Sequence, residues 1–414
     1  MKIKFLLLLF TIVTLVSCRQ KMVNTPSLQA GVSAAHINPP LGAFIAGDKQ
    51  NRTFTAVHDS LYAKAVVVTN GDEQLALVTL DCIGLLYPDV LRIRQKANEI
   101  CGFPEARIMV SSTHTHSGPD VVGIWGSDYE HPGVDSAYMT FLINTAAAQV
   151  KAAFENQQEV VAYTSETTFG EPWVQNICLE EIDRSVTVLQ LRNNEGKPVA
   201  TLTNFACHPT FMDARFSEVS SDYVNGYYKQ MKKQTGAEAL FLQGAIGGWV
   251  QPEDGEGSFE KAYLRGRELA DAVLSVLPHA NPLPSSKISF TSKQVRFPVE
   301  NEGWKQLAAL GTIRRDITDS VTTELAWFSI GEAQFVTHPG ETAPYYGLET
   351  KKLMGTGPRF VLGLSNDALG YIVKPTFFED KNIPHAEYLT SMSVGKPTAS
   401  LMMKQLRLII PGSK

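Results

Sequence analysis

Three apolar segments of the chain each end at a polar residue beside proline or glycine. Residues 107–112 lead into HTHSGP, residues 199–207 into HPT, and residues 333–337 into HPGET. Their apolar, β-branched composition predicts buried strands, which end at proline because it has no backbone donor. In open α/β sheets, reactive side chains collect beyond the strand ends, where loops converge on a rigid scaffold. The pattern therefore predicts an α/β fold with a functional site where these three loops meet.

Strand and helix patterns alternate along the rest of the chain. A hairpin is expected around Asn70-Gly71, a pair that favours tight turns, and Asp222 is expected to cap a helix that runs to Lys233. The strands are expected at residues 61–69, 74–81, 185–191, 199–205, 239–242, 289–297, 324–329, 333–337 and 359–364, and the other helices at residues 88–100, 136–156 and 259–277. The fold class that follows is α/β, with mixed β-sheets flanked by helices. Prolines and small polar residues at 278–286 mark a candidate internal boundary.

The polar residues at the strand ends are of kinds that bind metals. In a strand, residues two apart point to one face, so His114 and His116 can address one point, while His208 and Glu341 lie in the other two loops. Zinc takes three or four ligands, and two imidazoles with one carboxylate leave a position open for water. The same residues also fit a structural interpretation, in which the histidines make ordinary hydrogen bonds and Glu341 lies at the start of a helix.

Two aspartates near these loops have two interpretations each. Asp81 ends an apolar strand, and Asp213 follows His208 closely. Either carboxylate can orient a metal-bound imidazole or accept hydrogen bonds from loop amides.

Four motifs, taken in order along the chain, resemble the catalytic domain of the neutral/alkaline ceramidase family. They are HTHSGP at 114–119, NFACHPT at 204–210, PGET at 339–342 and GY at 370–371, and the resemblance runs from about Gly31 to about Gly395. It implies a neutral-ceramidase-like fold and a zinc amidase. In that enzyme, the metal is surrounded by His114, His208, Glu341 and Tyr371. His116 is then the general base or proton shuttle, and Tyr388 is a candidate donor to the developing oxyanion.

Several positions depart from the family pattern. The family serine that has been proposed as nucleophile corresponds to Gln251, whose amide can position a substrate but cannot form an acyl-enzyme. Ile177 stands where the family has an arginine near the substrate head group, and a further family tyrosine falls at Ser393. These changes affect the substrate and the oxyanion donor rather than the metal ligands.

The function that follows is zinc-dependent hydrolysis of an amide bond by metal-activated water, with N-acyl sphingosine as the substrate that the resemblance implies. The alternatives are hydrolysis of another exported amide or ester, such as an N-acylated sugar, and a non-catalytic lipoprotein that binds lipid or glycan. The partner expected is a small-molecule or lipid amide. Nucleic acid is not expected, because the formal net charge is −5 and no basic face is indicated.

The first residues indicate export. Lys2 and Lys4 precede an apolar stretch, and LVSC at 15–18 is a lipobox, so residues 1–17 are expected to be a signal peptide and Cys18 a lipidated cysteine. Residues 18–28 then form a tether and residues 29–414 the catalytic domain. The expected location is the cell envelope, at its periplasmic or outer-membrane face, with the membrane as a second partner through the lipid anchor.

Overall fold

The larger sheet of the computed structural model joins strands from the first two thirds of the chain. The structure describes residues 27–171, 173–253 and 257–413, so the predicted signal peptide and Cys18 lie outside it. The strand order is β11 (Glu238–Gln243), β9 (Pro198–Phe205), β8 (Ser185–Asn193), β6 (Gln158–Thr168), β1 (Gln29–His36), β3 (Tyr62–Asn70), β4 (Glu73–Leu80) and β5 (Ile108–Ser112), with β13 (Asn281–Pro282) beside β6. The outer pairs β11–β9 and β4–β5 are parallel and the others antiparallel, so the sheet is mixed.

A second, smaller sheet comes from the last third of the chain. Its order is β14 (Ile288–Pro298), β15 (Ser320–Ile330), β16 (Ala333–Thr337) and β18 (Arg359–Leu362), and only β16–β18 is parallel. Three stacked phenylalanines, Phe328, Phe335 and Phe360, form its inner face, with ring centroids 4.7 and 4.2 Å apart. Short pairs complete the sheets: β2 (Ala56–Val57) with β10 (Glu218–Val219), β7 (Val174–Asn176) with β12 (Val250–Pro252), and β17 (Glu341–Thr342) with β19 (Tyr371–Ile372).

Successive residues of the central strands face different layers. Val66 and Leu77 pack in the same cluster as the phenylalanines of the second sheet, whereas Val67 and Val78 pack with Leu142 of a helix. This alternation follows from the two-residue period of a strand, and it places the second sheet on one face and helices on the other.

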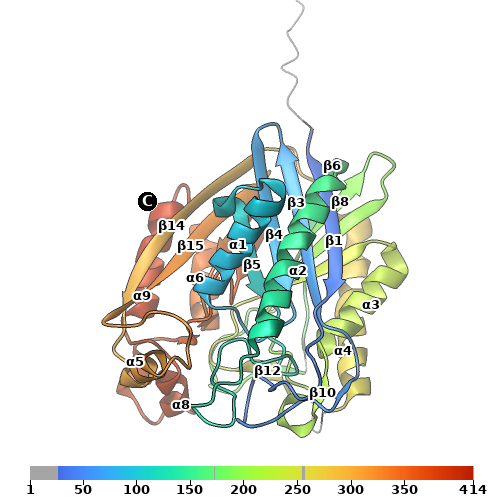
Figure 1. The fold of residues 1–414 in the computed structure, drawn as a ribbon. Helices are drawn as coiled ribbons and strands as arrows, with labels where there is room; N and C mark the ends of the chain where they lie inside the picture. The colour runs from blue at the N-terminus through green and yellow to red at the C-terminus, as the bar shows by residue number, and fades with distance from the viewer. Residues whose placement is uncertain (1–26, 172, 254–256, 414) are drawn as a thin grey trace, which may run out of the picture.

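The helices cover the outer faces of the two sheets (Figure 1). On the larger sheet lie α1 (Tyr87–Cys101), α2 (Ser136–Glu155), α3 (Tyr223–Thr235) and α4 (Phe259–Val276); on the smaller one lie α6 (Pro344–Leu353) and α9 (Thr398–Ile409). Shorter helices are α5 (Glu302–Ala309), α7 (Thr376–Glu379), α8 (Ala386–Ser391), and the 3₁₀ turns η1 (Glu105–Arg107), η2 (Asp213–Arg215) and η3 (Leu277–His279). In the part of the chain that the structure describes, none of the helices has the length and apolarity needed to cross a membrane. The predicted α/β class with mixed sheets is confirmed.

The structure corrects the helix start that the sequence suggested at Glu341. Glu341 does not begin a helix: it lies in β17, paired in parallel with Tyr371 of β19, and its amide donates to the Gly370 carbonyl at 2.9 Å. Helix α6 begins at Pro344 instead, because proline fits the first turn of a helix, where no backbone donor is needed. The strand pairing brings Glu341 and Tyr371 side by side.

Candidate metal centre

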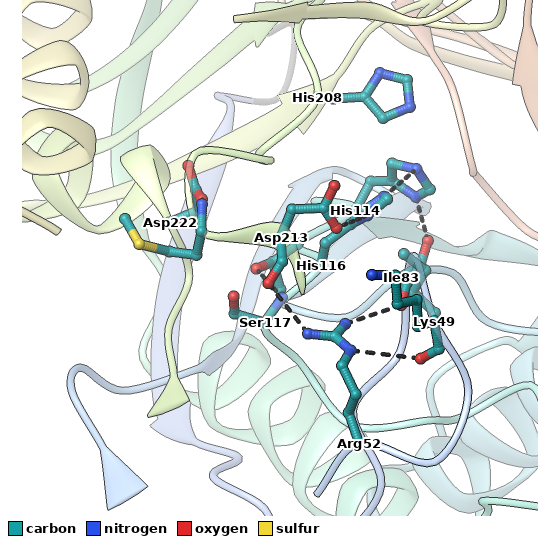
Figure 2. Close-up of polar contacts among 12 residues, drawn as sticks. Lys49, Arg52, Ile83, His114, His116, Ser117, His208, Asp213 and Asp222 are labelled. Atoms are coloured by element: carbon teal, nitrogen blue, oxygen red, sulfur yellow. Dashed lines mark hydrogen bonds and ion pairs between the residues drawn. The ribbon is translucent and has the colours of Figure 1, made fainter. Parts of the chain in front are cut away.

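Three imidazoles from two loops converge on one point. His114 and His116 follow β5, and His208 follows β9; Figure 2 shows the three side chains close to one another. The Nε2 atoms of His114 and His116 are 3.4 Å apart, and the ring centroid of His208 is 4.9 Å from that of His114. One nitrogen of each ring lies within 4.8 Å of the others, a spacing at which one metal ion can be shared.

The route by which His114 and His116 meet differs from the prediction. Strand β5 ends at Ser112, so the alternation of a strand does not set their directions. His114 instead has a left-handed backbone with φ of 70°, and its amide donates to the Cys82 carbonyl at 2.9 Å. The convergence predicted from sequence is present, but a turn rather than a pleat produces it.

Each imidazole is held by its Nδ1 atom. His114 Nδ1 donates to the Ile83 carbonyl, His208 Nδ1 to the Val250 carbonyl at 2.8 Å, and His116 Nδ1 to Asp213 Oδ1 at 3.2 Å. An N–H bond at Nδ1 fixes the tautomer that leaves the Nε2 lone pair unprotonated. All three rings therefore present a metal-binding nitrogen to the same point.

Glu341 adds a carboxylate to the cluster. Its Oε2 is 3.1 Å from His208 Nε2 and 3.5 Å from His114 Nε2, and the side chain is buried. Burial alone would raise its pKa, but the neighbouring imidazoles of His114 and His208 outweigh burial and hold the pKa of Glu341 well below its ordinary value. Burial also lowers the pKa of His208. A carboxylate that stays charged, with imidazole Nε2 atoms that give up their protons when a metal binds, is the donor set that suits Zn²⁺.

Two tyrosines lie beside this carboxylate. Tyr371 is buried, its hydroxyl accepts a hydrogen bond from Trp249 Nε1 at 2.7 Å, and burial together with the Glu341 charge raises its pKa well above 10. Tyr388 on α8 is 46% exposed, with its ring 6.0 Å from that of Tyr371, and burial of its inner part with the Glu341 charge raises its pKa to about 12. Without a metal, both phenols are protonated at neutral pH and can donate.

The structure gives Asp213 and Asp81 different roles. Asp213 holds His116, and burial, which raises its pKa, is outweighed by His116, so the pKa of Asp213 is lowered. Asp81 instead accepts hydrogen bonds from the Tyr62 amide at 2.9 Å and the Tyr228 hydroxyl at 3.3 Å, so it joins the start of β3 to α3.

Two further residues support the site that sequence reasoning did not find. Gln243, fully buried at the end of β11, donates through Nε2 to the carbonyls of Thr113 and Cys207, at 3.0 and 2.9 Å. It thereby ties together the residues that directly precede His114 and His208. The only signal in the sequence is a polar residue at the end of an apolar strand.

Arg52 supports the other side of the site. Its guanidinium donates to the Asp213 carbonyl at 3.1 Å and to the Gly47 carbonyl at 2.9 Å. Figure 2 shows Arg52 below the histidines, beside Asp213. The two loops that flank His116 are thus joined through a single side chain.

Gln251 lies next to the histidines rather than among them. It is on β12, directly opposite Gln175 of β7, and it follows Val250, whose carbonyl holds His208. Its side chain lines a cavity with Asp213, whereas a different cavity is lined by His114, Glu341 and the two tyrosines.

Comparison with known proteins gives one family name by two routes. No protein-family model matches the chain. Neutral ceramidase B of Dictyostelium discoideum is 26% identical over 191 residues, 40% of this chain, and the match spans about a quarter (26%) of that relative's length. The crystal structure of neutral ceramidase from Pseudomonas aeruginosa has a TM-score of 0.75 at 15% identity, covering 93% of this chain and 74% of that one. A structure titled "Ceramidase complexed with C2" has the same TM-score at 14% identity, covering 93% and 75%. The resemblance to the neutral ceramidase family is confirmed, and the chain has the neutral ceramidase fold.

Proposed function

We propose that the protein is a zinc-dependent hydrolase that cleaves the amide bond of an N-acylated amine, as ceramidases do. The observation that carries the proposal is the convergence of three Nδ1-anchored imidazoles, two of which, His114 and His208, contact the buried carboxylate of Glu341. Site and fold support each other, since the proteins of the same fold and partial sequence similarity are ceramidases.

The residues fit a zinc ion by number and by type. His114, His208 and Glu341 would hold it, with Tyr371 beside them. When bound there, zinc supplies an acidic water whose pKa falls toward about 7 and polarises the amide carbonyl.

His116 is suited to move the proton. Its Nδ1–H is held by Asp213, so Nε2 is the free atom, and it faces the cluster. It would take a proton from water at Nε2 and return it to the departing amine nitrogen. The Asp213 carboxylate favours the protonated ring that exists between these two transfers.

The tyrosine hydroxyls are suited to donate a hydrogen bond to the carbonyl oxygen of the substrate amide. The hydroxyl of Tyr388, with its raised pKa, keeps its proton at neutral pH and lines the same cavity as His116 and Glu341. A donor aimed at the developing oxyanion stabilises the transition state more than the substrate. No serine is needed as nucleophile, and Gln251 cannot be acylated.

We also propose that the enzyme is exported and lipid-anchored through Cys18, as the lipobox predicts. The substrate would then be an extracytoplasmic amide. A non-catalytic lipoprotein that binds lipid or glycan would not need the donor atoms of the three histidines and Glu341. Metal analysis joined to a hydrolysis screen therefore separates a hydrolase from a binding protein.

The test is metal analysis joined to a hydrolysis screen. The purified protein should contain about one zinc per chain and should release amine from an N-acyl sphingosine or an N-acylated sugar. His208→Ala should lose both metal and activity, while His131→Ala, a change at an exposed histidine outside the cluster, should keep both. Full metal occupancy in His208→Ala would contradict the ligand assignment, and zinc without turnover would favour the binding protein.

A further inference from the structure

Two cavities of different character share Asp48 in their linings. The first, called the apolar cavity, is lined by His114, His116, Glu341 and the two tyrosines, together with Ile83, Val122, Ile124, Trp125, Trp304 and Met392. The second, called here the polar cavity, is lined by Asp48, Gln175, Asp213, Arg215, Gln251 and Glu253. Asp48 lines both, and Asp213 of the polar cavity holds His116 of the apolar one. The amide bond would therefore lie between the two.

The apolar cavity is small. Its volume is about 70 Å³, against about 400 Å³ for the polar cavity. One water molecule needs roughly 10–15 Å³ of such space, so the apolar cavity has space for about five to seven groups of that size. It is therefore large enough for a short acyl group, and a long alkyl chain would not be enclosed by it.

The polar cavity offers more polar than apolar surface, although Phe211 and Pro252 also line it. Gln175 and Gln251 lie directly opposite each other on β7 and β12, and neither side-chain amide has a protein hydrogen-bond partner among the residues described. An amide both donates and accepts, which matches the hydroxyl groups of a polyol. The three carboxylates of Asp48, Asp213 and Glu253 face a single guanidinium, Arg215, so the lining is acidic. An acidic lining disfavours an anionic head group and tolerates a neutral or cationic one.

We propose that the substrate joins a short acyl group, held in the apolar cavity, to a polyhydroxylated amine of the amino-sugar class, held in the polar cavity. This inference rests on the proposed amide hydrolysis and names its substrate. An N-acyl sphingosine with two long chains fits the same site poorly, because one chain would exceed the apolar cavity and the other would lie against charged and amide side chains.

The first experiment is a substrate matrix with the zinc-loaded full-length protein. Amine release is measured from N-acetyl-, N-hexanoyl- and N-palmitoyl-glucosamine and from N-acetyl- and N-palmitoyl-sphinganine. We expect kcat/KM to be highest for N-acetylglucosamine and at least about 100-fold lower for N-palmitoyl-sphinganine, since a site built to hydrogen-bond its substrate strongly rejects analogues that lack those groups. The highest kcat/KM on N-palmitoyl-sphinganine would overturn the inference and leave the proposed function intact.

Failure of the proposed function has a different signature, namely no release from any of the five amides. Binding then decides the inference separately: calorimetry with glucosamine should show saturable binding, reduced in Gln251→Ala. Absence of glucosamine binding, or binding unaffected by that variant, would overturn it.

Two kinds of variant assign the cavities. Gln175→Ala and Gln251→Ala should each raise KM for N-acetylglucosamine about 5- to 150-fold with little change in kcat, because an unpaired substrate hydroxyl costs binding in both ground and transition states. Gln95→Ala, an exposed glutamine on α1, is the matched control and should change neither. Ile124→Ala enlarges the apolar cavity and should shift the preferred acyl chain to a longer one. Unchanged KM in both glutamine variants would contradict the assignment.

Discussion

Gly47 gives a direct test of whether the position of His116 matters. Gly47 has a φ of +86°, and a Cβ built there would lie 2.5 Å from His116 Nδ1 and 2.6 Å from its Cγ. Gly42, five residues earlier in the same loop, also has a φ of +86°, but a Cβ there would meet nothing within 4 Å. The two alanine variants therefore share the backbone strain and differ in the contact with the imidazole.

The magnitudes follow from these contacts. Alanine in a left-handed conformation costs about 1–2 kcal/mol of stability, so Gly42→Ala should unfold more easily by about that amount and Gly47→Ala by at least that amount. An ordinary contact begins near 3.4 Å, so in Gly47→Ala the His116 ring must move by about 1 Å. That movement breaks the 3.2 Å bond to Asp213, and a displacement of about 1 Å at a reacting group costs on the order of 100-fold in rate.

The assay compares kcat/KM, zinc content and urea unfolding for the wild type and both variants. We expect Gly42→Ala to lose stability alone, and Gly47→Ala to lose at least as much stability and also about 100-fold in kcat/KM. Zinc should remain in both if His116 moves protons rather than binding the metal. Equal activity of the two variants would refute the role given to the His116–Asp213 pair, because their backbone strain is matched.

Three further predictions concern the site, the pH dependence and the location. His116→Ala should keep zinc but lose roughly 10²–10⁴-fold in rate, and loss of the metal would instead show that His116 coordinates. Burial raises the pKa of Asp81 to about 7 from 3.8. Between these pH values the folded protein keeps a proton that the unfolded chain has released, so stability falls as pH rises through this window. In urea titrations at several pH values, Asp81→Asn should remove up to roughly 4 kcal/mol of the fall in unfolding free energy across this window. An unchanged dependence of the unfolding free energy on pH would contradict the raised pKa. Cys18→Ala should release the protein from membranes or block its maturation, and equal membrane recovery after washing would exclude a lipid anchor.

The elements that the sequence predicts well are those with local signals. The hairpin at Asn70-Gly71 appears as β3 and β4, and Asp222 caps α3 by accepting from the Tyr223 amide at 2.6 Å. The helix start suggested at Glu341 was wrong, because the local pattern, an acidic residue after Pro-Gly, fits both a helix start and a short strand. Its actual partner is Tyr371, thirty residues later, and the energy of that pairing is not visible in any short window.

The kinds of residue at the site were predictable, but their supports were not. Histidines before Pro and Gly at strand ends suggested ligands, and these histidines do converge. Gln243 and Arg52 act through partners more than a hundred residues away, at Thr113 and Asp213. Whether such a polar residue faces solvent or bridges two loops depends on the packing of the sheets, which periodicity does not encode.

Main-chain atoms orient the candidate metal ligands, whereas side-chain atoms line the cavity proposed to select the substrate. His114 and His208 are oriented by the main-chain carbonyls of Ile83 and Val250, which every residue type supplies, so substitution of those two side chains leaves the anchors in place. The polar cavity, in contrast, depends on side chains such as Gln251, the immediate neighbour of Val250 on β12. One short strand thus holds the imidazole of His208 through its backbone and, in the proposed binding mode, would contact the substrate amine through the next side chain. Exchange of Gln251 for another residue can therefore change the amine that is accepted while the metal ligands keep their geometry.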